Sequence, residues 1–234
     1  MSIHCIVLAG GLGTRLMPIT QHKPKPLVLY KGVPLISRIV NSLYPFCQSL
    51  TVVTKHMHEQ FLDIPYSFRK CNLTYSDTDN MAAAFLEACK SVDEDYVVGI
   101  SSDIVFAEDI VEKAFSRLSS DCVHVFLTKS DTQSYKKWYW EIDNERLLDI
   151  RIEENPTGYE KLFILFPKTI LEEYTKGFEE NMATSKKELQ GHESFNSGWI
   201  YLLHKMLIAD IEVRAVVLDG VIENINSIED LKAI

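Results

Sequence analysis

The sequence predicts an α/β protein with three layers, in which helices cover both faces of a mainly parallel sheet, and a smaller sub-region beside it. Apolar segments of strand length alternate with segments of helical periodicity through the first half of the chain. One strand-like segment, Tyr96–Ile100, is continuously apolar, which is typical of a strand buried on both faces. Such alternation favours parallel strands, because parallel neighbours are joined by crossover helices.

The elements of the first half are identified by their apolar pattern. Leu35–Leu43 has apolar residues at helical spacing, and Met81–Cys89 is an apolar segment rich in alanine, which favours a helix. In chain order we expect a strand at Ile3–Leu8, a helix at Leu35–Leu43, strands at Leu50–Thr54 and Asn72–Ser76, a helix at Met81–Cys89, a strand at Tyr96–Ile100, a helix at Ile110–Leu118 and a strand at Cys122–Leu127. The strands Ile3–Leu8 and Tyr96–Ile100 should lie near each other, with ligands bound beyond their carboxyl ends.

The second half is less regular and predicts the smaller sub-region. In chain order we expect a hairpin at Trp138–Ile142 and Leu147–Ile152, a strand at Lys161–Phe166, a helix at Thr169–Phe178, a strand at Val213–Leu218 and a short helix at Ile228–Ala233. We find no internal repeat, low-complexity stretch or linker. A single domain over 1–234 is therefore expected, with halves at about 1–130 and about 131–234.

The composition restricts the partners. The chain has 234 residues and a formal net charge of −9, which argues against nucleic acid as the main partner. No apolar run approaches the ~18 residues that span a bilayer, so we expect no membrane partner and a cytoplasmic location. The five cysteines have neither metal-ligand spacing nor a disulfide framework, so reduced thiols are expected. The oligomeric state stays open, with a homodimer among the alternatives.

The glycine-rich segment after the first strand carries the strongest functional signal. Gly10, Gly11 and Gly13 precede Arg15, and Lys25 follows between two prolines. Glycines let the backbone pass close to an anion and turn its N–H groups inward. Arg15 adds a planar fork for phosphate oxygens, and Lys25 adds a point charge. This pattern predicts a triphosphate site, although it lacks the end of a P-loop and the third glycine of a dinucleotide fingerprint.

The segment resembles the signature of the sugar-nucleotidyltransferase superfamily, G-x-G-T-R-x-x-P-x-T-x-x-x-P-K-P-L. The matching residues are Gly11, Gly13, Thr14, Arg15, Pro18, Thr20, Pro24, Lys25, Pro26 and Leu27. The resemblance implies a Rossmann-like nucleotidyltransferase fold and transfer of a nucleotidyl group to a small phosphorylated acceptor, with release of pyrophosphate. It also implies nucleotide contacts at Leu8, Ala9, Gly10, Gly11, Gly13, Thr14, Arg15, Asn80, Met81 and Ser102.

The same resemblance implies Mg²⁺ as cofactor and three catalytic residues. Arg15 would hold the β- and γ-phosphates, and Lys25 would bridge the attacking phosphate and the α-phosphate. Asp103, at the end of an apolar strand, would bind Mg²⁺, and its alternative role is a helix cap. The second metal ligand of the family falls on Asn224 or Asn226, where acids are expected. An amide oxygen can still bind Mg²⁺, but without charge.

Departures in the second half favour one branch of the superfamily. Members for sugar 1-phosphates carry Glu-Lys-Pro and then Asn-x-Gly, whereas Asn155 replaces the lysine here and no Asn-x-Gly follows in Gly158–Phe166. The chain is more similar to the small phosphocholine-type cytidylyltransferases, which implies CTP and an acceptor such as phosphocholine. Aromatic faces attract ammonium groups. Expected acceptor contacts are Trp138, Trp140, Glu141, Glu193 and Trp199. Trp199 is expected in a loop, and core packing is the alternative role of each tryptophan.

Two other functions stay open. One is a sugar-1-phosphate nucleotidyltransferase that uses UTP, dTTP or GTP. The other is a non-catalytic regulatory homologue, which the two late asparagines favour. The presence of Arg15, Lys25 and Asp103 argues against the second.

Overall fold

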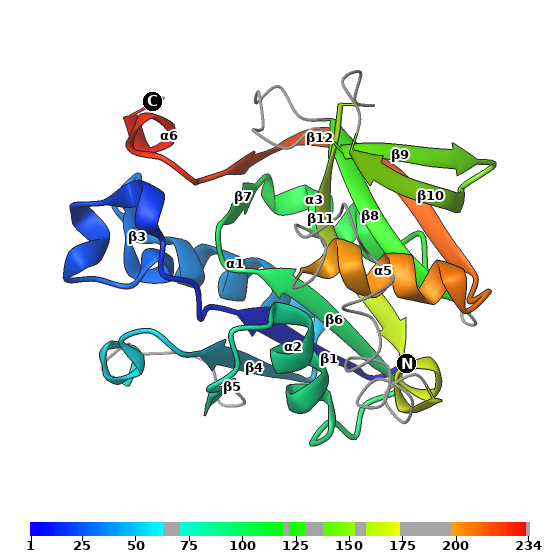
Figure 1. Ribbon diagram of the computed structural model, residues 1–234, viewed down its shortest axis with the longest axis horizontal. Coiled ribbons are helices and arrows are strands. Elements are labelled where there is room, and N and C mark those ends of the chain that lie inside the picture. Colours follow the sequence, from blue (N-terminus) through cyan, green and yellow to red (C-terminus); the bar gives the residue numbers. More distant parts are fainter. Residues whose placement is uncertain (63–70, 119–121, 130–137, 153–157, 174–197, 233–234) are drawn as a thin grey trace.

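A computed structural model describes residues 1–62, 71–118, 122–129, 138–152, 158–173 and 198–232. Its centre is one large mixed sheet (Figure 1). The strand order is β5 (Cys71–Tyr75), β4 (Ser49–Thr54), β1 (Ile3–Leu8), β6 (Tyr96–Ser101), β11 (Tyr159–Pro167), β8 (Val123–Lys129), β12 (Val213–Asn224), β10 (Arg146–Ile152) and β9 (Trp138–Asp143). The short strand β7 (Ile104–Phe106) pairs with β12. The first four strands in this order are parallel, and β11 is antiparallel to both of its neighbours.

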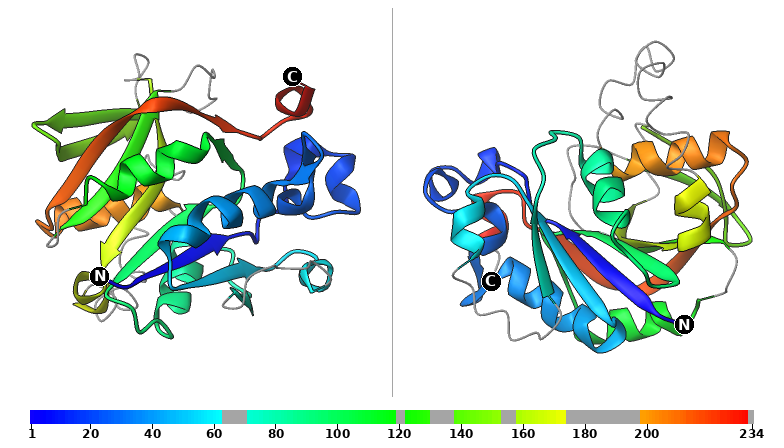
Figure 2. Two further views of the ribbon diagram at one scale, coloured as in Figure 1. Left: turned by 180° about the vertical axis from the view of Figure 1, so that it is seen from behind. Right: turned by 90° about the horizontal axis from the view of Figure 1, so that it is seen from below.

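Helices cover both faces of the sheet, as the sequence predicts (Figure 2). The helices α1 (Leu35–Leu43) and α3 (Glu108–Phe115) lie on one face, and α2 (Met81–Cys89) and α5 (Trp199–Ile208) lie on the other. Two apolar clusters fill the layers between helices and sheet, one on each face. The three-layer α/β prediction is therefore confirmed.

Most predicted elements are present. The helices at Leu35–Leu43 and Met81–Cys89 have the predicted bounds, and the hairpin of β9 and β10 turns at two residues with positive φ, Asn144 and Glu145. The segment 168–173 is helical, and the rest of the helix expected at Thr169–Phe178 lies outside the described residues. The short helix α6 (Ile228–Lys232) ends the described chain.

Strand β12 is longer than predicted, and its extension positions the site. The predicted strand ended at Leu218, whereas β12 continues to Asn224. Its register against β8 shifts between Leu218 and Val221, around Gly220 with φ of 149°. Such a bulge bends a strand and re-aims it. Beyond the bulge, β12 leaves β8 and pairs with β7, with Asn224 opposite Ile104.

Helix α5 was missed because it begins with the short apolar run Trp199–Leu203, which has no clear helical period. Short apolar runs do not distinguish strand from helix. The loop expected at Trp199 is therefore wrong, since Trp199 is the first residue of α5. A Cβ at Gly99 in β6 would lie 2.4 Å from the Trp199 ring, so the indole occupies the space that this glycine leaves on the sheet.

All five cysteines are free thiols, in agreement with the expectation from their spacing. Across the described ranges, none of the helices is both long enough and apolar enough to cross a bilayer.

Candidate functional site

The glycine loop between β1 and the first helical turn is shaped by Gly13. Gly13 has φ of 63°, in the left-handed region that side chains disfavour. A Cβ there would lie 2.8 Å from the Cβ atom of Lys25, so the glycine also lets Lys25 approach. The hydroxyl of Thr20 donates to the carbonyl of Gly13 at 2.8 Å and holds the loop. Gly13 and Thr20 thus fix the backbone of the loop, and the side chain of Lys25 lies beside it.

Four predicted residues meet at the carboxyl end of the sheet. The ammonium of Lys25 lies 2.8 Å from a carboxylate oxygen of Asp103 and donates to the amide oxygen of Asn226 at 3.0 Å. The guanidinium of Arg15 donates to the same amide oxygen at 2.8 Å. We call Arg15, Lys25, Asp103 and Asn226 the charge cluster. It joins residues from three distant parts of the sequence.

Hydrogen bonds of the backbone hold Asp103 and Asn226 in place within the charge cluster. The N–H of Ser102 donates to the carbonyl of Leu8 at 3.1 Å, which ties the turn before Asp103 to the end of β1. The N–H of Ile225 donates to the carbonyl of Asp103 at 2.9 Å. The backbone N–H of Asn226 donates to the carboxylate of Asp230 at 2.7 Å. Asp230 therefore caps the start of α6, and Asn226 is the residue that faces the cluster.

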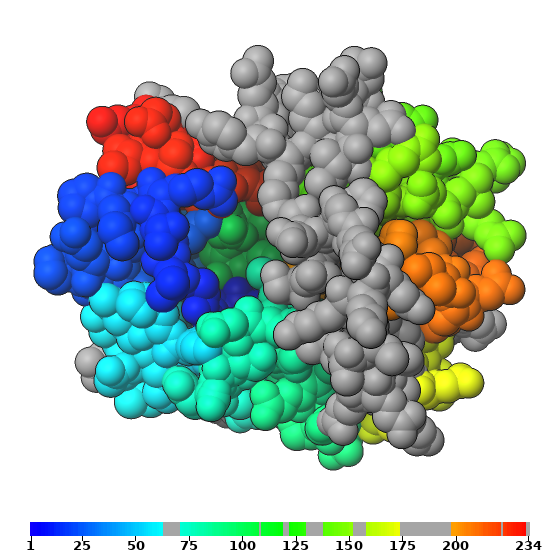
Figure 3. All heavy atoms as spheres, in the orientation of Figure 1, coloured from blue at the N-terminus to red at the C-terminus, as the bar shows by residue number. Residues whose placement is uncertain are grey.

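The long β12 strand brings the end of the chain to the glycine loop. In the space-filling view the red C-terminal residues lie against the blue N-terminal segments (Figure 3).

The three-residue 3₁₀ turns Thr14–Leu16 and Lys25–Leu27 carry Arg15 and Lys25. Pro24 and Pro26 flank Lys25 and restrict its backbone. The cations are thus held on rigid turns.

The donor set fits a Mg²⁺ ion that is also bound by phosphates. The oxygens of Asp103 and Asn226 both contact the Lys25 ammonium, so one carboxylate and one amide oxygen face the same point. Magnesium commonly takes one or two protein carboxylates and completes its shell with water and phosphate oxygens. No group of three acidic, histidine or cysteine side chains that could hold a metal occurs within the ranges described. A Mg²⁺ ion at this point would complete its shell with water or with the phosphate oxygens of a ligand.

Asn224 lies apart from the charge cluster. Its amide nitrogen donates to a carboxylate oxygen of Glu160 at 3.3 Å. Desolvation raises the pKa of Glu160, and the approach of Asp103 raises it further. Between the two predicted late metal ligands, the geometry favours Asn226.

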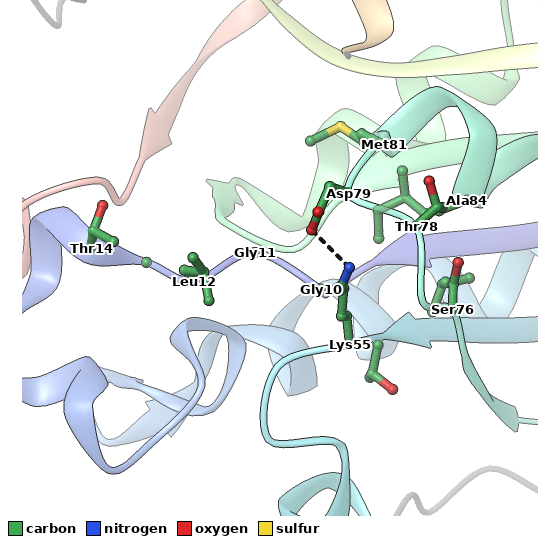
Figure 4. A pocket seen from close by; sticks show the side chains of 14 residues that line it. Gly10, Gly11, Leu12, Thr14, Lys55, Ser76, Thr78, Asp79, Met81 and Ala84 are labelled. Carbon is green, nitrogen blue, oxygen red and sulfur yellow. Dashed lines mark hydrogen bonds and ion pairs between the residues drawn. The ribbon is translucent and has the colours of Figure 1, made fainter.

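Two adjoining hollows form a groove along the glycine loop. The first, of about 370 Å³, lies between the loop, the end of β4 and the start of α2 (Figure 4). Its lining includes the predicted residues Leu8, Gly10, Gly11, Gly13, Thr14 and Met81. The second, of about 200 Å³, contains the charge cluster and Ser102. Of the other predicted nucleotide contacts, Ala9 is buried and Asn80 caps α2 by accepting from the N–H of Ala83 at 3.0 Å.

The sequence reasoning missed Lys55 and Asp79, which face each other across the first hollow (Figure 4). The Lys55 ammonium lies 2.7 Å from the Asp79 carboxylate, and this bond raises the pKa of Lys55. Lys55 follows Thr54 at the carboxyl end of β4, beside β1. A cation directly after a predicted strand of a parallel sheet is the signal that could have found it.

The predicted acceptor-side tryptophans occupy different environments. Trp140 and Trp199 are only 2% and 4% exposed and belong to the apolar cluster under α2 and α5. The indole N–H of Trp199 donates to the hydroxyl of Ser101 at 2.8 Å, and its ring packs edge-on against Phe85. The rings of Trp140 and Trp199 are thus core packing, the alternative role stated above. Trp138 is half-buried at the start of β9 and keeps some accessible surface.

The predicted acceptor-side acids are only partly described. Glu141 forms an ion pair of 2.6 Å with Arg151 on the neighbouring strand, and the Arg151 guanidinium lies over the ring of Tyr139. Glu193 lies outside the described residues. Glu141 therefore already has a counter-charge in its own hairpin.

Sequence comparisons identify two kinds of relative. The bifunctional protein GlmU of Methanocaldococcus jannaschii is 30% identical over 108 residues, 46% of this chain and 26% of that protein. A 2-aminoethylphosphonate cytidylyltransferase of Lancefieldella rimae is 39% identical over 59 residues, 25% of this chain and 24% of that protein. The chain matches about a quarter of the length of these two relatives.

Structural comparisons agree on the fold. The inositol-1-phosphate CTP transferase of T. maritima superposes with a TM-score of 0.77 at 17% identity, over 98% of this chain and 91% of that one. The CTP:phosphocholine cytidylyltransferase LicC of Streptococcus pneumoniae gives 0.73 at 19% identity, over 99% and 97%. A family model described as a MobA-like NTP transferase domain matches residues 5–193, which is most of the chain. With the glycine loop, Arg15, Lys25 and Asp103 all within that span, the chain belongs to the family of MobA-like NTP transferase domains.

Proposed function

We propose that the protein is a Mg²⁺-dependent cytidylyltransferase that joins CMP to a small acceptor bearing a phosphate or phosphonate and releases pyrophosphate. The observation that carries this proposal is the charge cluster at the glycine loop, where Arg15, Lys25, Asp103 and Asn226 converge within 3.0 Å contacts. Two cations, one carboxylate and a glycine-rich backbone suit a triphosphate that carries its own metal. The proposal for CTP is supported by the cytidylyltransferase relative matched over 59 residues.

Each residue of the charge cluster has a separate role in the proposed nucleotidyl transfer. An anionic oxygen of the acceptor attacks the α-phosphorus, the bond to the bridging oxygen breaks, and pyrophosphate leaves with the electron pair. The attacking oxygen is already ionised, so no protein base is needed. Lys25, with only 12% of its side chain exposed, stabilises charge between the attacking group and the α-phosphate. Arg15 holds the outer phosphates with its planar fork. Bound Mg²⁺ would supply charge neutralisation on the phosphate oxygens, held by Asp103 and Asn226.

The acceptor half supports a small cationic acceptor through Trp138. Trp138 packs against the apolar core and is half-buried, and we propose that its remaining exposed surface contacts the ammonium group of the acceptor. Trp140 and Trp199 are not proposed as contacts, because both rings are buried in the core.

A sugar-1-phosphate nucleotidyltransferase remains a second candidate. A UTP–glucose-1-phosphate uridylyltransferase of Haloferax volcanii is 31% identical over 120 residues, 47% of this chain and 49% of that protein. The glycine loop and charge cluster would serve either acceptor equally, because both reactions attack the same phosphorus. Discrimination therefore has to come from the acceptor half and from the base.

A pyrophosphate-release screen tests the proposal directly. Purified protein with Mg²⁺ would be incubated with CTP, UTP, dTTP or GTP against choline phosphate, 2-aminoethylphosphonate and several hexose 1-phosphates. We expect the fastest turnover with CTP and an amino-alcohol phosphate or phosphonate. Faster turnover with a hexose 1-phosphate would contradict the acceptor proposed here, and no pyrophosphate with any pair would contradict nucleotidyl transfer itself.

Replacing Lys25 by Ala should lower kcat by about 10²–10³-fold, because one preorganised donor to the transition state is lost. The matched control is Lys23→Ala, which removes an exposed lysine two residues away. Stopped-flow or coupled pyrophosphate assays would measure both variants, with circular dichroism to verify folding. A folded Lys25→Ala enzyme with the turnover of the Lys23→Ala enzyme would remove Lys25 from the mechanism.

Replacing Trp138 by Ala should raise KM for a cationic acceptor roughly tenfold and leave KM for CTP nearly unchanged, because a partly desolvated cation–π contact contributes up to ~2 kcal/mol. The control is Tyr139→Ala, whose ring already lies under Arg151 in the hairpin. Steady-state kinetics with each substrate varied would separate the two constants. An equal change in both constants, or none, would mean that the acceptor binds elsewhere.

A further inference from the structure

Strand β11 carries a lysine whose charged end is enclosed. Lys161 is the third residue of this central strand, and its ammonium nitrogen is buried without a hydrogen-bond partner among the described residues. The nitrogen lies 5.3 Å from the centre of the Trp199 ring, which contributes a weak attraction. An ammonium group has three donors, and burying it without acceptors is strongly unfavourable. The arrangement is therefore expensive in the absence of a ligand.

The register of the sheet places Lys161 toward the end of the groove that contains the charge cluster. Strand β11 is antiparallel to β6, with Ile164 opposite Gly99. Residues before Ile164 therefore lie toward the carboxyl end of β6, where Ser101 and Asp103 line the second hollow. Trp199, which lies beside the Lys161 ammonium, also donates to the hydroxyl of Ser101.

The charges around Lys161 are acidic and come from the site itself. Burial lowers the pKa of Lys161 to about 8, while Asp103 and Glu160 act in the opposite direction and favour its charged form. Asp103 is engaged with Lys25, and Glu160 accepts from Asn224. Both carboxylates thus influence Lys161 through space, while their hydrogen bonds are made with other residues.

We propose that the Lys161 ammonium binds the oxyanion group, phosphate or phosphonate, of the acceptor. This deepens the proposed function, on which it rests, by naming the residue that supplies the acceptor-side positive charge. The family lysine expected in the second half is replaced by Asn155, which lies outside the described residues. Lys161 supplies the same charge from β11, on the part of that strand that lies toward the hollow containing Lys25 and Asp103. An acceptor oxyanion between the two lysines would have its attacking oxygen beside the α-phosphate.

The competing role is structural, in which Lys161 only offsets the negative charge of Asp103 and Glu160. The two roles differ in their effect on stability. A lysine kept for a ligand lowers the stability of the empty protein, so an apolar replacement of similar length should preserve or raise the unfolding temperature. A lysine kept for charge balance should lower it when replaced. The variant Lys161→Met makes this comparison, and Lys168→Met, after the far end of β11, is the matched control.

The experiment measures binding of inorganic phosphate by calorimetry to protein saturated with α,β-methylene CTP, which blocks the triphosphate groove and cannot react. Wild type, Lys161→Met, Lys161→Arg and Lys168→Met would be compared, together with their thermal unfolding without ligand. We expect at least a tenfold weaker phosphate affinity for Lys161→Met and partial recovery for Lys161→Arg. Nucleotide affinity should change less than threefold, the unfolding temperature of Lys161→Met should not fall, and Lys168→Met should match wild type in phosphate affinity.

Unchanged phosphate affinity in a folded Lys161→Met protein would overturn the inference, as would equal losses of nucleotide and phosphate affinity with a lower unfolding temperature. These results are independent of turnover. If the substrate screen finds no transfer but phosphate binding still depends on Lys161, the proposed reaction fails and the anion site stands. If transfer occurs and acceptor KM is unaffected by Lys161→Met, the reaction stands and the anion site fails.

Discussion

The contact between the Lys25 ammonium and the Asp103 carboxylate is the interaction around which this site is organised. At 2.8 Å and with both side chains largely covered, it joins the glycine-loop segment to the end of β6. Asn226 adds the end of β12 to the same point through its amide oxygen. A ligand that brings a metal must compete with Lys25 for the Asp103 oxygen. The triphosphate offers Lys25 new acceptors, so the exchange conserves charge pairing in a partly buried place.

A second constraint is the path of β12, which links the two halves of the chain. It begins beside β8, bends at the bulge around Gly220 and ends beside β7. This single strand carries Asn224 to Glu160 and Asn226 to the cations of the glycine loop. The two halves of the chain therefore meet at one end of this strand. Asn224 and Asn226 stand where the family resemblance implies acids, so Asp103 is the carboxylate that contacts Lys25.

The nucleotide half was predictable because its signals are local. Helical apolar spacing fixed α1 and α2 at their observed bounds, and the glycine, arginine and lysine spacing predicted the phosphate loop. The acceptor half was less predictable because burial there depends on distant partners. Nothing in the sequence near Trp199 shows that its ring fills the space above Gly99, a hundred residues earlier.

The same reason explains the residues that were missed at the site. Lys55 and Lys161 follow no motif, and their importance comes from where the sheet places them. Lys55 lines the groove because β4 lies beside β1, and Lys161 lies toward the carboxyl end of β6 because β11 runs antiparallel to that strand. Strand order and direction are global properties, so the sequence alone left the late metal ligand undecided between Asn224 and Asn226. The fold favours Asn226 by tying the backbone of Ile225 to Asp103.

We propose that Asp103 holds the metal that accompanies the triphosphate. This role is tested most directly by the Mg²⁺ dependence of pyrophosphate release in Asp103→Asn, with Asp109→Asn, an exposed carboxylate on α3, as control. Because the variant keeps an oxygen ligand but loses the charge, we predict at least a tenfold rise in the half-saturating Mg²⁺ concentration. The control should titrate like wild type. A Mg²⁺ titration of Asp103→Asn that coincides with wild type would contradict the account, since the metal would then be held without Asp103.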